Sequence, residues 1–323
     1  MKLARTLFGA IAGITFAGMA SAQSYPSKPI RLMVPFGGGA SAVELTARLF
    51  APKLGEMLGQ SMYVENRAGA NGMIGSEVIA RAPADGYHLL YTTPSTHVTA
   101  TFTSKQVPYD PVRDFTPISA TVEPVSGIVV NPRFPINNVR ELVDYAKANP
   151  GKLSYTSSGI GSVFHLTGEL LNSAAGINLL HVPYKGSQQA LTDTMTGEAS
   201  MTLAAISGPM PFVKAGKLRM IAILESRRYA GLPDMPTVGE TIPGFEKPAS
   251  WFGFFGPANL PPPVVNRLHG EIVKMLALPD IRQKLDEAGL AVIGSTPAEF
   301  AALIKRGFEV YGKAFALSGI KPE

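Results

Sequence analysis

One local pattern constrains this chain more than any other: a strand that breaks at a glycine-containing turn and continues as a helix. At residues 153–166, Tyr155 and Thr156 favour a strand, a Ser/Gly turn interrupts it, and apolar residues at helical spacing follow. Residues 30–58 repeat this order around Gly37-Gly-Gly-Ala-Ser41. The first amides of a helix lack intrahelical partners and carry the positive end of its dipole, so both turns suit an anion.

Plainer explanations of the two turns stay open on the residues alone. A glycine turn needed for packing explains residues 37–41 about as well, and residues 153–166 also fit an ordinary capped helix after a strand. The turn at residues 37–41 is not a known nucleotide motif. No Gly-Lys-Ser/Thr follows its glycines, and no Gly-x-Gly-x-x-Gly opens the helix after it.

The remaining pattern predicts an α/β fold with two mostly parallel sheets. Strands and helices alternate over residues 30–92 and again over residues 115–224, as in parallel sheets covered by helices. The loops at Gly38, Thr93 and Ser158 follow the carboxyl ends of strands, where such sheets bind ligands. After these units, residues 227–245 form a Pro- and Gly-rich connection and residues 251–255 a strand. Three helices are predicted to follow, at residues 263–276, 280–288 and 297–316.

The first 22 residues predict a cleaved export signal. Lys2 and Arg5 precede an apolar run that is too short to span a bilayer stably, and Ala20-Ser21-Ala22 fits an A-x-A cleavage site. We therefore expect an exported mature chain from Gln23 onward. The chain has no cysteine, which excludes disulfides, thiolate metal sites and a lipid anchor on cysteine.

Charge and motif content exclude several function classes. The formal charge is +5, from 29 basic and 24 acidic residues, and the two basic residues of the signal leave 27 and 24, or +3. No Lys/Arg-rich run and no basic-aromatic interleaving occurs, so we expect no nucleic-acid partner. The five histidines show no metal-binding spacing, and we expect neither a metal nor a cofactor.

A set of phrases, in order along the mature chain, resembles one family. The chain is similar to the Bug-type periplasmic solute receptors of the tripartite tricarboxylate transporter family. The phrases are Tyr25-Pro-x-Lys-Pro-Ile-Arg31, Val34-Pro-Phe-x-Gly-Gly, Val64-Glu-Asn-Arg-x-Gly-Ala70, Ala82-Pro-Ala-Asp-Gly-Tyr87, Ala146-Lys-Ala-Asn-Pro-Gly-Lys152, Ser157-Ser-Gly-x-Gly-Ser162 with His165-Leu166, His181-Val-Pro-Tyr-Lys-Gly186 and Leu232-Pro-x-Met-Pro-Thr237.

The resemblance implies a two-lobed, hinged binding protein of the type II (Venus flytrap) class. We expect one lobe from residues 23–120 plus 226–323 and the other from residues 121–225, with hinges near Thr121 and Glu225. The implied function is to bind a small mono-, di- or tricarboxylate, aromatic ones included, in the cleft between the lobes. The implied partners are the membrane permease subunits of such a transporter. We expect no enzymatic activity and a monomer.

The expected ligand-binding residues supply hydroxyls and amides without competing negative charge. The resemblance implies that the turns at residues 36–41 and 181–186 face each other across the cleft and that residues 157–162 join them. Lys185 is expected either to pair with a second carboxylate or to be a solvated strand-end lysine. The full set is Phe36, Gly38, Gly39, Ala40, Ser41, Thr93, Ser95, Ser157, Ser158, Gly159, Ser162, Tyr184, Lys185 and Gly186.

The first turn departs from the family pattern. The family usually has Gly-Gly-x-x-Asp with an arginine four residues later, whereas here Ala-Ser-Ala-Val separates Gly38-Gly39 from Glu44, and Arg48 follows four residues after that acid. An acid in this loop would contact the ammonium of an amino-acid ligand. Its displacement therefore favours a plain carboxylate over an amino acid.

The alternative function is an exported serine hydrolase of the α/β class that uses Ser162 or Ser158. His165 lies three residues after Ser162 on one helix, a spacing that rarely gives a nucleophile–base contact, and no Gly-x-Ser-x-Gly elbow is present. We therefore predict that His165 is a packed, hydrogen-bonded histidine and that His181 packs or caps. Trp251, the only tryptophan, is predicted to lie in the core.

Overall fold

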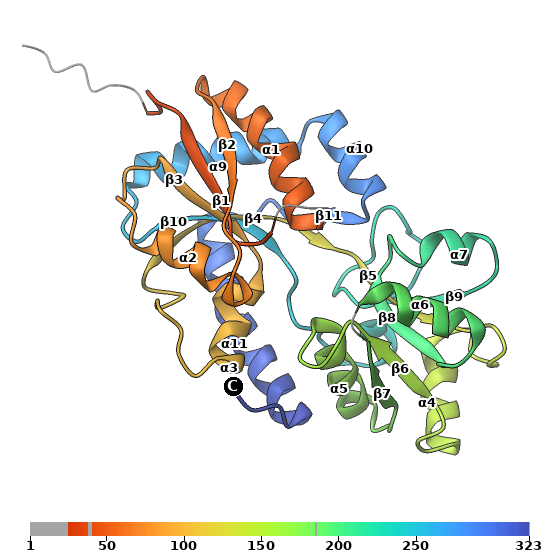
Figure 1. The fold of residues 1–323 in the computed structure, drawn as a ribbon. Coiled ribbons are helices and arrows are strands. Elements are labelled where there is room, and N and C mark those ends of the chain that lie inside the picture. The colour runs from red at the N-terminus through yellow and green to blue at the C-terminus, as the bar shows by residue number, and fades with distance from the viewer. Residues whose placement is uncertain (1–24, 38–40, 185, 323) are drawn as a thin grey trace, which may run out of the picture.

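The computed structural model describes residues 25–37, 41–184 and 186–322, which form two lobes around two separate β-sheets (Figure 1). We call the lobe around the six-stranded sheet the first lobe and the other the second lobe. The strand order of the first sheet is β11-β4-β10-β3-β1-β2. Its strands are β1 (Ile30–Val34), β2 (Met62–Asn66), β3 (His88–Thr92), β4 (Phe115–Pro124), β10 (Phe252–Pro257) and β11 (Leu290–Val292).

The first sheet is mixed, which corrects the predicted mostly parallel arrangement. β1 pairs in parallel with β2 and β3, as the alternation of strands and helices predicts. β10 lies between β3 and β4 and runs antiparallel to both, and β11 is antiparallel to β4. The chain reaches β10 only after it returns from the second lobe, so its pairing depends on a long-range contact that local periodicity does not contain.

The second sheet has five strands in the order β7-β6-β8-β5-β9. β6 pairs in parallel with β7 and β8, whereas β5 runs antiparallel to β8 and β9. This sheet is therefore mixed as well, because β5 enters directly from the first lobe. The strands are β5 (Ser126–Val130), β6 (Ser154–Ser157), β7 (Leu180–Pro183), β8 (Met201–Ala205) and β9 (Arg219–Ile223).

Helices cover both sheets, and several begin at signals visible in the sequence. Proline occupies the first turn of α9, and Thr296 and Glu299 form a capping box at the start of α11. In the first lobe the helical segments are α1 (Ala42–Leu58), the 3-10 turn η1 (Ala70–Gly72), α2 (Met73–Ala80), the π-helical turn η2 (Ser95–Thr99), α3 (Ala100–Thr103), α9 (Pro262–Leu276), α10 (Pro279–Glu287) and α11 (Pro297–Ser318). In the second lobe they are α4 (Val139–Ala148), α5 (Val163–Ala175), α6 (Ser187–Thr196), α7 (Met210–Lys214) and α8 (Val238–Thr241).

The first lobe has a hydrophobic core on each face of its sheet. The core under α1, α9 and α10 includes Leu32 and Phe254, and the core under α2 and α11 includes Trp251 and Phe300. Trp251 is only 1% exposed, which confirms its predicted place in the core. Leu166 of α5 joins the second of these cores, so α5 also packs against the first lobe.

The described chain passes between the lobes twice. The first crossing is at Val125, between β4 and β5, and the second runs over residues 245–251, before β10. After β9 the chain stays on the second lobe, because Val238 and Ile242 are buried in that lobe's core. The predicted lobe boundary at Glu225 stays a prediction, and these contacts favour a return to the first lobe about twenty residues later.

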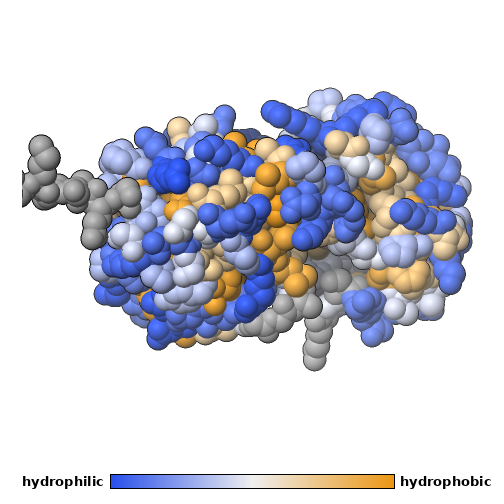
Figure 2. Space-filling view, turned by 90° about the horizontal axis from the view of Figure 1, so that it is seen from above, coloured by the Kyte–Doolittle hydropathy of each residue, from blue (hydrophilic) through white to orange (hydrophobic). Residues whose placement is uncertain are grey.

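Seen from above, the surface shows two rounded halves that meet along a seam, with hydrophobic residues gathered beside the seam on the half of the first lobe (Figure 2). In the part of the chain that the structure describes, no helix is both long enough and apolar enough to cross a bilayer. The predicted export signal lies outside the described residues.

Candidate functional site

In the second lobe, two of the predicted turns lie side by side because they follow neighbouring parallel strands. β6 and β7 are in register with Ser157 opposite Pro183. Beyond this pair, the Tyr184 amide donates to the Ser157 carbonyl at 3.2 Å. The turn at residues 157–162 and Tyr184 therefore share one edge of the sheet, as predicted from the strand pattern.

The turn at residues 157–162 is held by its own hydroxyls and glycines. The Ser157 hydroxyl accepts from the Gly159 amide at 3.2 Å, and the Ser162 hydroxyl caps α5 by accepting from the His165 amide at 3.3 Å. Gly159 and Gly161 have φ angles of 130° and 77°, in the region that side chains with a Cβ rarely adopt. The two glycines thus allow the backbone conformation of this turn, and the hydroxyls of Ser157 and Ser162 fix it by hydrogen bonds.

Two histidines are hydrogen-bonded to this turn. His165 Nδ1 accepts a hydrogen bond from the Gly161 amide at 3.1 Å, and His181 Nε2 lies 2.7 Å from the Ser157 hydroxyl. The rings of His165 and His181 stack with their centroids 3.9 Å apart. The ring of Tyr155 also stacks on His181, with a centroid distance of 5.0 Å. His165 is therefore a packed, hydrogen-bonded histidine, as predicted.

Burial keeps both imidazoles neutral near pH 7. Desolvation, with His165 adding to it, lowers the pKa of His181 to about 4. Burial also lowers the pKa of His165, although the Glu169 carboxylate opposes that shift. A neutral His165 is what the geometry needs, because a proton on Nδ1 would remove the acceptor of the Gly161 amide.

The turn leaves several hydrogen-bond donors for a ligand. Among the described residues, the amides of Ser158, Ile160, Val163 and Phe164 have no protein acceptor. The Ser158 side chain is exposed, and its hydroxyl also lacks a described partner. Because these donors gather at the amino end of the thirteen-residue helix α5, they can hold an anion.

In the first lobe, the ends of β1 and β3 bring Phe36 and the Thr93–Ser95 loop to one edge. A Cβ on Gly72 would lie 2.7 Å from Thr96 and 3.1 Å from Phe36, so these two loops meet around this glycine. The Thr93 and Ser95 hydroxyls lie 2.8 Å apart and are half-buried. Ser41 is exposed at the start of α1, and its side chain makes no cap hydrogen bond.

The displaced acid of the first turn is fully engaged inside the first lobe. The Glu44 side chain is completely buried, and its carboxylate accepts from Arg48 Nε at 2.6 Å and from the Asn66 amide group. Asn66 also donates to the Phe36 carbonyl at 3.1 Å. Within the described part of the chain, both Glu44 oxygens are therefore engaged, and Glu44 holds the Phe36 end of the first turn through Asn66.

Some predicted residues are not available or not described. The Tyr184 hydroxyl donates to Asp193 at 2.6 Å, so it is committed within the second lobe. Gly38, Gly39, Ala40 and Lys185 lie outside the described residues. The predicted ligand contacts of the set, and the predicted facing of the first turn and the 181–186 turn across the cleft, stay predictions.

Sequence reasoning missed His97. It lies in the π-helical turn η2, directly after the Thr93–Ser95 loop, and is completely buried. Its Nδ1 pairs with the Thr96 hydroxyl at 2.9 Å, and its ring stacks on Phe255 at 4.0 Å. No motif marks this residue, and the one available signal was its place beside a predicted ligand loop.

The geometry does not support the hydrolase alternative. The Ser162 hydroxyl serves as the helix cap, and Ser158 has no histidine partner among the described residues. Ser157 does contact His181, but its side chain is buried inside the turn and cannot meet a substrate. Across the described positions, no group of three or more Asp, Glu or His side chains is placed to hold a metal ion.

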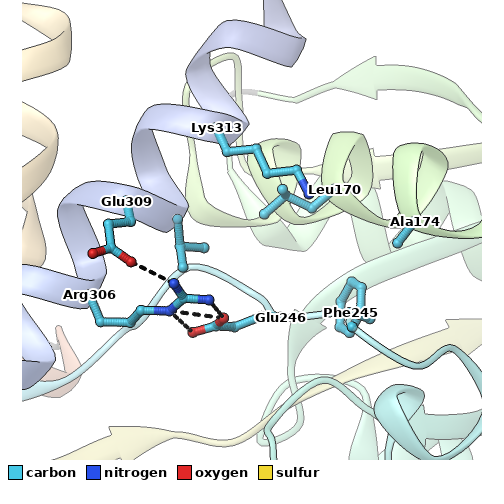
Figure 3. A pocket seen from close by; sticks show the side chains of 9 residues that line it. Leu170, Ala174, Phe245, Glu246, Arg306, Glu309 and Lys313 are labelled. Atoms are coloured by element: carbon cyan, nitrogen blue, oxygen red, sulfur yellow. Dashed lines mark hydrogen bonds and ion pairs between the residues drawn. The ribbon is translucent and has the colours of Figure 1, made fainter.

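A small cavity of about 110 Å³ lies apart from these turns, between α5, α11 and residues 244–246 (Figure 3). Arg306 of α11 pairs there with Glu246 and with Glu309. None of the predicted ligand-binding residues lines this cavity.

Comparison with known proteins gives the family. Residues 46–313 match the family model described as the tripartite tricarboxylate transporter family receptor. The solved periplasmic binding protein BugD is 32% identical, with 93% of this chain and 100% of that one covered and a TM-score of 0.69. An R. palustris protein with adipate is also 32% identical, with the same coverage and a TM-score of 0.73.

A third solved relative is MatC from Rhodopseudomonas palustris with bound malate, 28% identical over 90% of this chain and 99% of that one, with a TM-score of 0.67. These matches confirm the predicted two-lobed binding-protein fold and the prediction of a receptor rather than an enzyme. The chain belongs to the receptor family of the tripartite tricarboxylate transporters.

Proposed function

We propose that this receptor binds a small carboxylate between its two lobes and passes it to a permease of the tripartite tricarboxylate type in the periplasm. One observation carries the proposal: donors without a partner among the described residues gather at the amino end of α5. They are the Ser158 hydroxyl and the amides of Ser158, Ile160, Val163 and Phe164. A carboxylate binds where hydrogen-bond donors gather and no acidic side chain competes for them.

The relatives narrow the ligand class. The adipate and malate in the two solved R. palustris proteins are both dicarboxylates. In this chain, the Thr93–Ser95 hydroxyls and the segment around Gly186 are the second and third places where a carboxylate or hydroxyl group of such a ligand would bind. We expect the receptor to act as a monomer and to close around the ligand by bending at the two crossings.

A thermal-shift screen tests the proposal and its ligand class. We expect dicarboxylates without an amino group to stabilise ligand-stripped protein by about 3 kcal/mol at a hundredfold excess over Kd. The melting temperature should therefore rise with the logarithm of the ligand concentration. Succinate should shift it more than aspartate, since Glu44 is engaged by Arg48 and Asn66 and leaves the ammonium uncompensated. A larger shift with the amino acid would contradict the ligand class, and no shift with any carboxylate would contradict the function.

Replacement of Ser158 with alanine tests the site. Loss of one hydrogen bond to a charged carboxylate should cost about 1.5–3 kcal/mol, which weakens binding roughly tenfold to a hundredfold. The melting temperature of the empty protein should not change, because this exposed hydroxyl has no described partner. Calorimetric titration with the best dicarboxylate measures the effect. Thr192→Ala, at an exposed hydroxyl on α6, is the matched control, and equal affinities of the two variants would exclude Ser158 from the site.

A further inference from the structure

Both passages of the chain between the lobes meet one buried ion cluster. At the first crossing, the Val125 amide donates to Gly289 of the first lobe and its carbonyl accepts from Ile206 of the second, both at 2.9 Å. Glu123 precedes this crossing and Ser126 follows it. The single residue of the crossing is thus hydrogen-bonded to each lobe, and its flanking residues carry the contacts described next.

The second crossing contributes Lys247, whose side chain is only 6% exposed. Its ammonium lies 3.2 Å from Glu225 and 3.8 Å from Glu123, and it donates to Ser250 at 2.8 Å. Both carboxylate oxygens of Glu225 accept from the Ser126 amide, at 3.0 and 3.1 Å. The Lys247 ammonium therefore links the second crossing to both sides of the first. It contacts Glu123 on the first-lobe side, and through Glu225 it is connected to Ser126 on the second-lobe side.

Stability alone does not account for such a cluster. Removing two charges from water costs several kcal/mol each, and an apolar pair of similar volume is often as stable. Burial raises the pKa of Glu225, and the Lys247 charge and the Ser126 amide oppose that shift. What the ion pair adds is a fixed geometry, because the buried carboxylate is satisfied only while Lys247 and Ser126 keep their places.

The residue before Lys247 strengthens this arrangement. Glu246 pairs with Arg306 of α11, on the side of the crossing that borders the small cavity (Figure 3). Tyr311 of α11 donates to the Ala249 carbonyl at 2.7 Å. The second crossing is therefore held against the first lobe by α11 and against the first crossing by Lys247.

We propose that Lys247 sets the angle between the lobes of the empty receptor by holding the two crossings together through Glu123 and Glu225. Lys247 is a positioning residue that acts on the cleft without touching the ligand. A receptor with a narrow range of lobe angles loses less conformational freedom on closure, so the cluster favours ligand binding.

Distances between spin labels test the proposal without any ligand, so the result does not depend on the proposed function. The chain has no cysteine, so a label pair goes only where cysteines are introduced, at Glu56 of α1 and Asp144 of α4, both exposed. In the double variant Lys247→Met with Glu225→Gln, neither charge stays buried alone, and the glutamine oxygen still accepts from Ser126. We expect this variant to melt within a few degrees of the parent protein while the interlobe distance distribution widens at least about twofold.

The matched control removes an ion pair away from the crossings whose carboxylate is as buried as that of Glu225. Glu271 of α9 is 5% exposed and pairs with Arg267 at 2.7 Å, so Arg267→Met with Glu271→Gln should leave the distribution unchanged. An unchanged width in the Lys247 variant would overturn the proposal, as would equal widening in the control. If the double variant does not fold by circular dichroism, Glu123→Gln replaces it, since that side chain is 29% exposed. An unchanged width there overturns the proposal too.

Discussion

Replacement of Gly168 with alanine is expected to destabilise the second lobe by at least about 3 kcal/mol, the upper end of the usual cost of overpacking. A Cβ at this position of α5 would lie 2.1 Å from Tyr155 Cζ and 2.5 Å from its hydroxyl. The Tyr155 ring cannot give way, because it is completely buried under the helix. Thermal unfolding followed by circular dichroism should show a melting temperature lower by roughly 6 °C or more.

The same substitution should weaken ligand binding. The Tyr155 hydroxyl shares its one proton between Glu169 at 2.8 Å and the His165 carbonyl at 3.1 Å, and its ring stacks on His181. A displaced Tyr155 therefore shifts the two histidines that hold the 157–162 turn. The affinity for a carboxylate should fall even at temperatures where the variant is fully folded.

Gly270 of α9 provides the control for this prediction. It also lies inside a helix, but a Cβ there would meet nothing within 4 Å. Gly270→Ala should be neutral or stabilising by up to about 1 kcal/mol, because alanine has the higher helix propensity. If Gly168→Ala melts like Gly270→Ala, the close packing of α5 on Tyr155 is wrong.

Local patterns predicted the parts of this molecule that local physics determines. The apolar run of β1 and the Ser/Gly turn before α5 are recognisable because their hydrophobic period and turn chemistry lie within a dozen residues. Ser157 and Ser162, whose hydroxyls shape the 157–162 turn, were predicted as ligand contacts, and that role stays a prediction. The family resemblance then supplied the two-lobed arrangement, which periodicity alone does not give.

The features that were missed depend on contacts between distant segments. β10 pairs antiparallel between β3 and β4, more than a hundred residues away from either, and no local signal encodes that choice. The commitment of Glu44 to Asn66 and of the Tyr184 hydroxyl to Asp193 likewise depends on neighbours that only the fold brings close. The buried His97 carries no motif at all, yet it leads to the largest expected effect of pH.

Acid should destabilise the first lobe through His97. Burial lowers the pKa of His97 to about 3, whereas an unfolded histidine titrates near 6.5. Between these values the unfolded chain binds more protons than the folded one, so the free energy of unfolding falls as the pH falls. This one group should remove about 2 kcal/mol between pH 8 and pH 5, and about 4 kcal/mol by pH 3. Urea unfolding across this pH range measures the loss.

His97→Phe isolates that contribution from those of His165 and His181, whose lowered pKa values act in the same direction. Phenylalanine keeps the stacking on Phe255 and removes Nε2, a buried nitrogen without a partner among the described residues. Thr96 still has the Thr92 hydroxyl at 2.9 Å, so the lost hydrogen bond leaves no buried group unpaired. The variant should therefore match the parent near pH 8 and exceed its stability by about 2 kcal/mol at pH 5. Parallel pH profiles for the two proteins would mean that His97 does not stay neutral in the folded state.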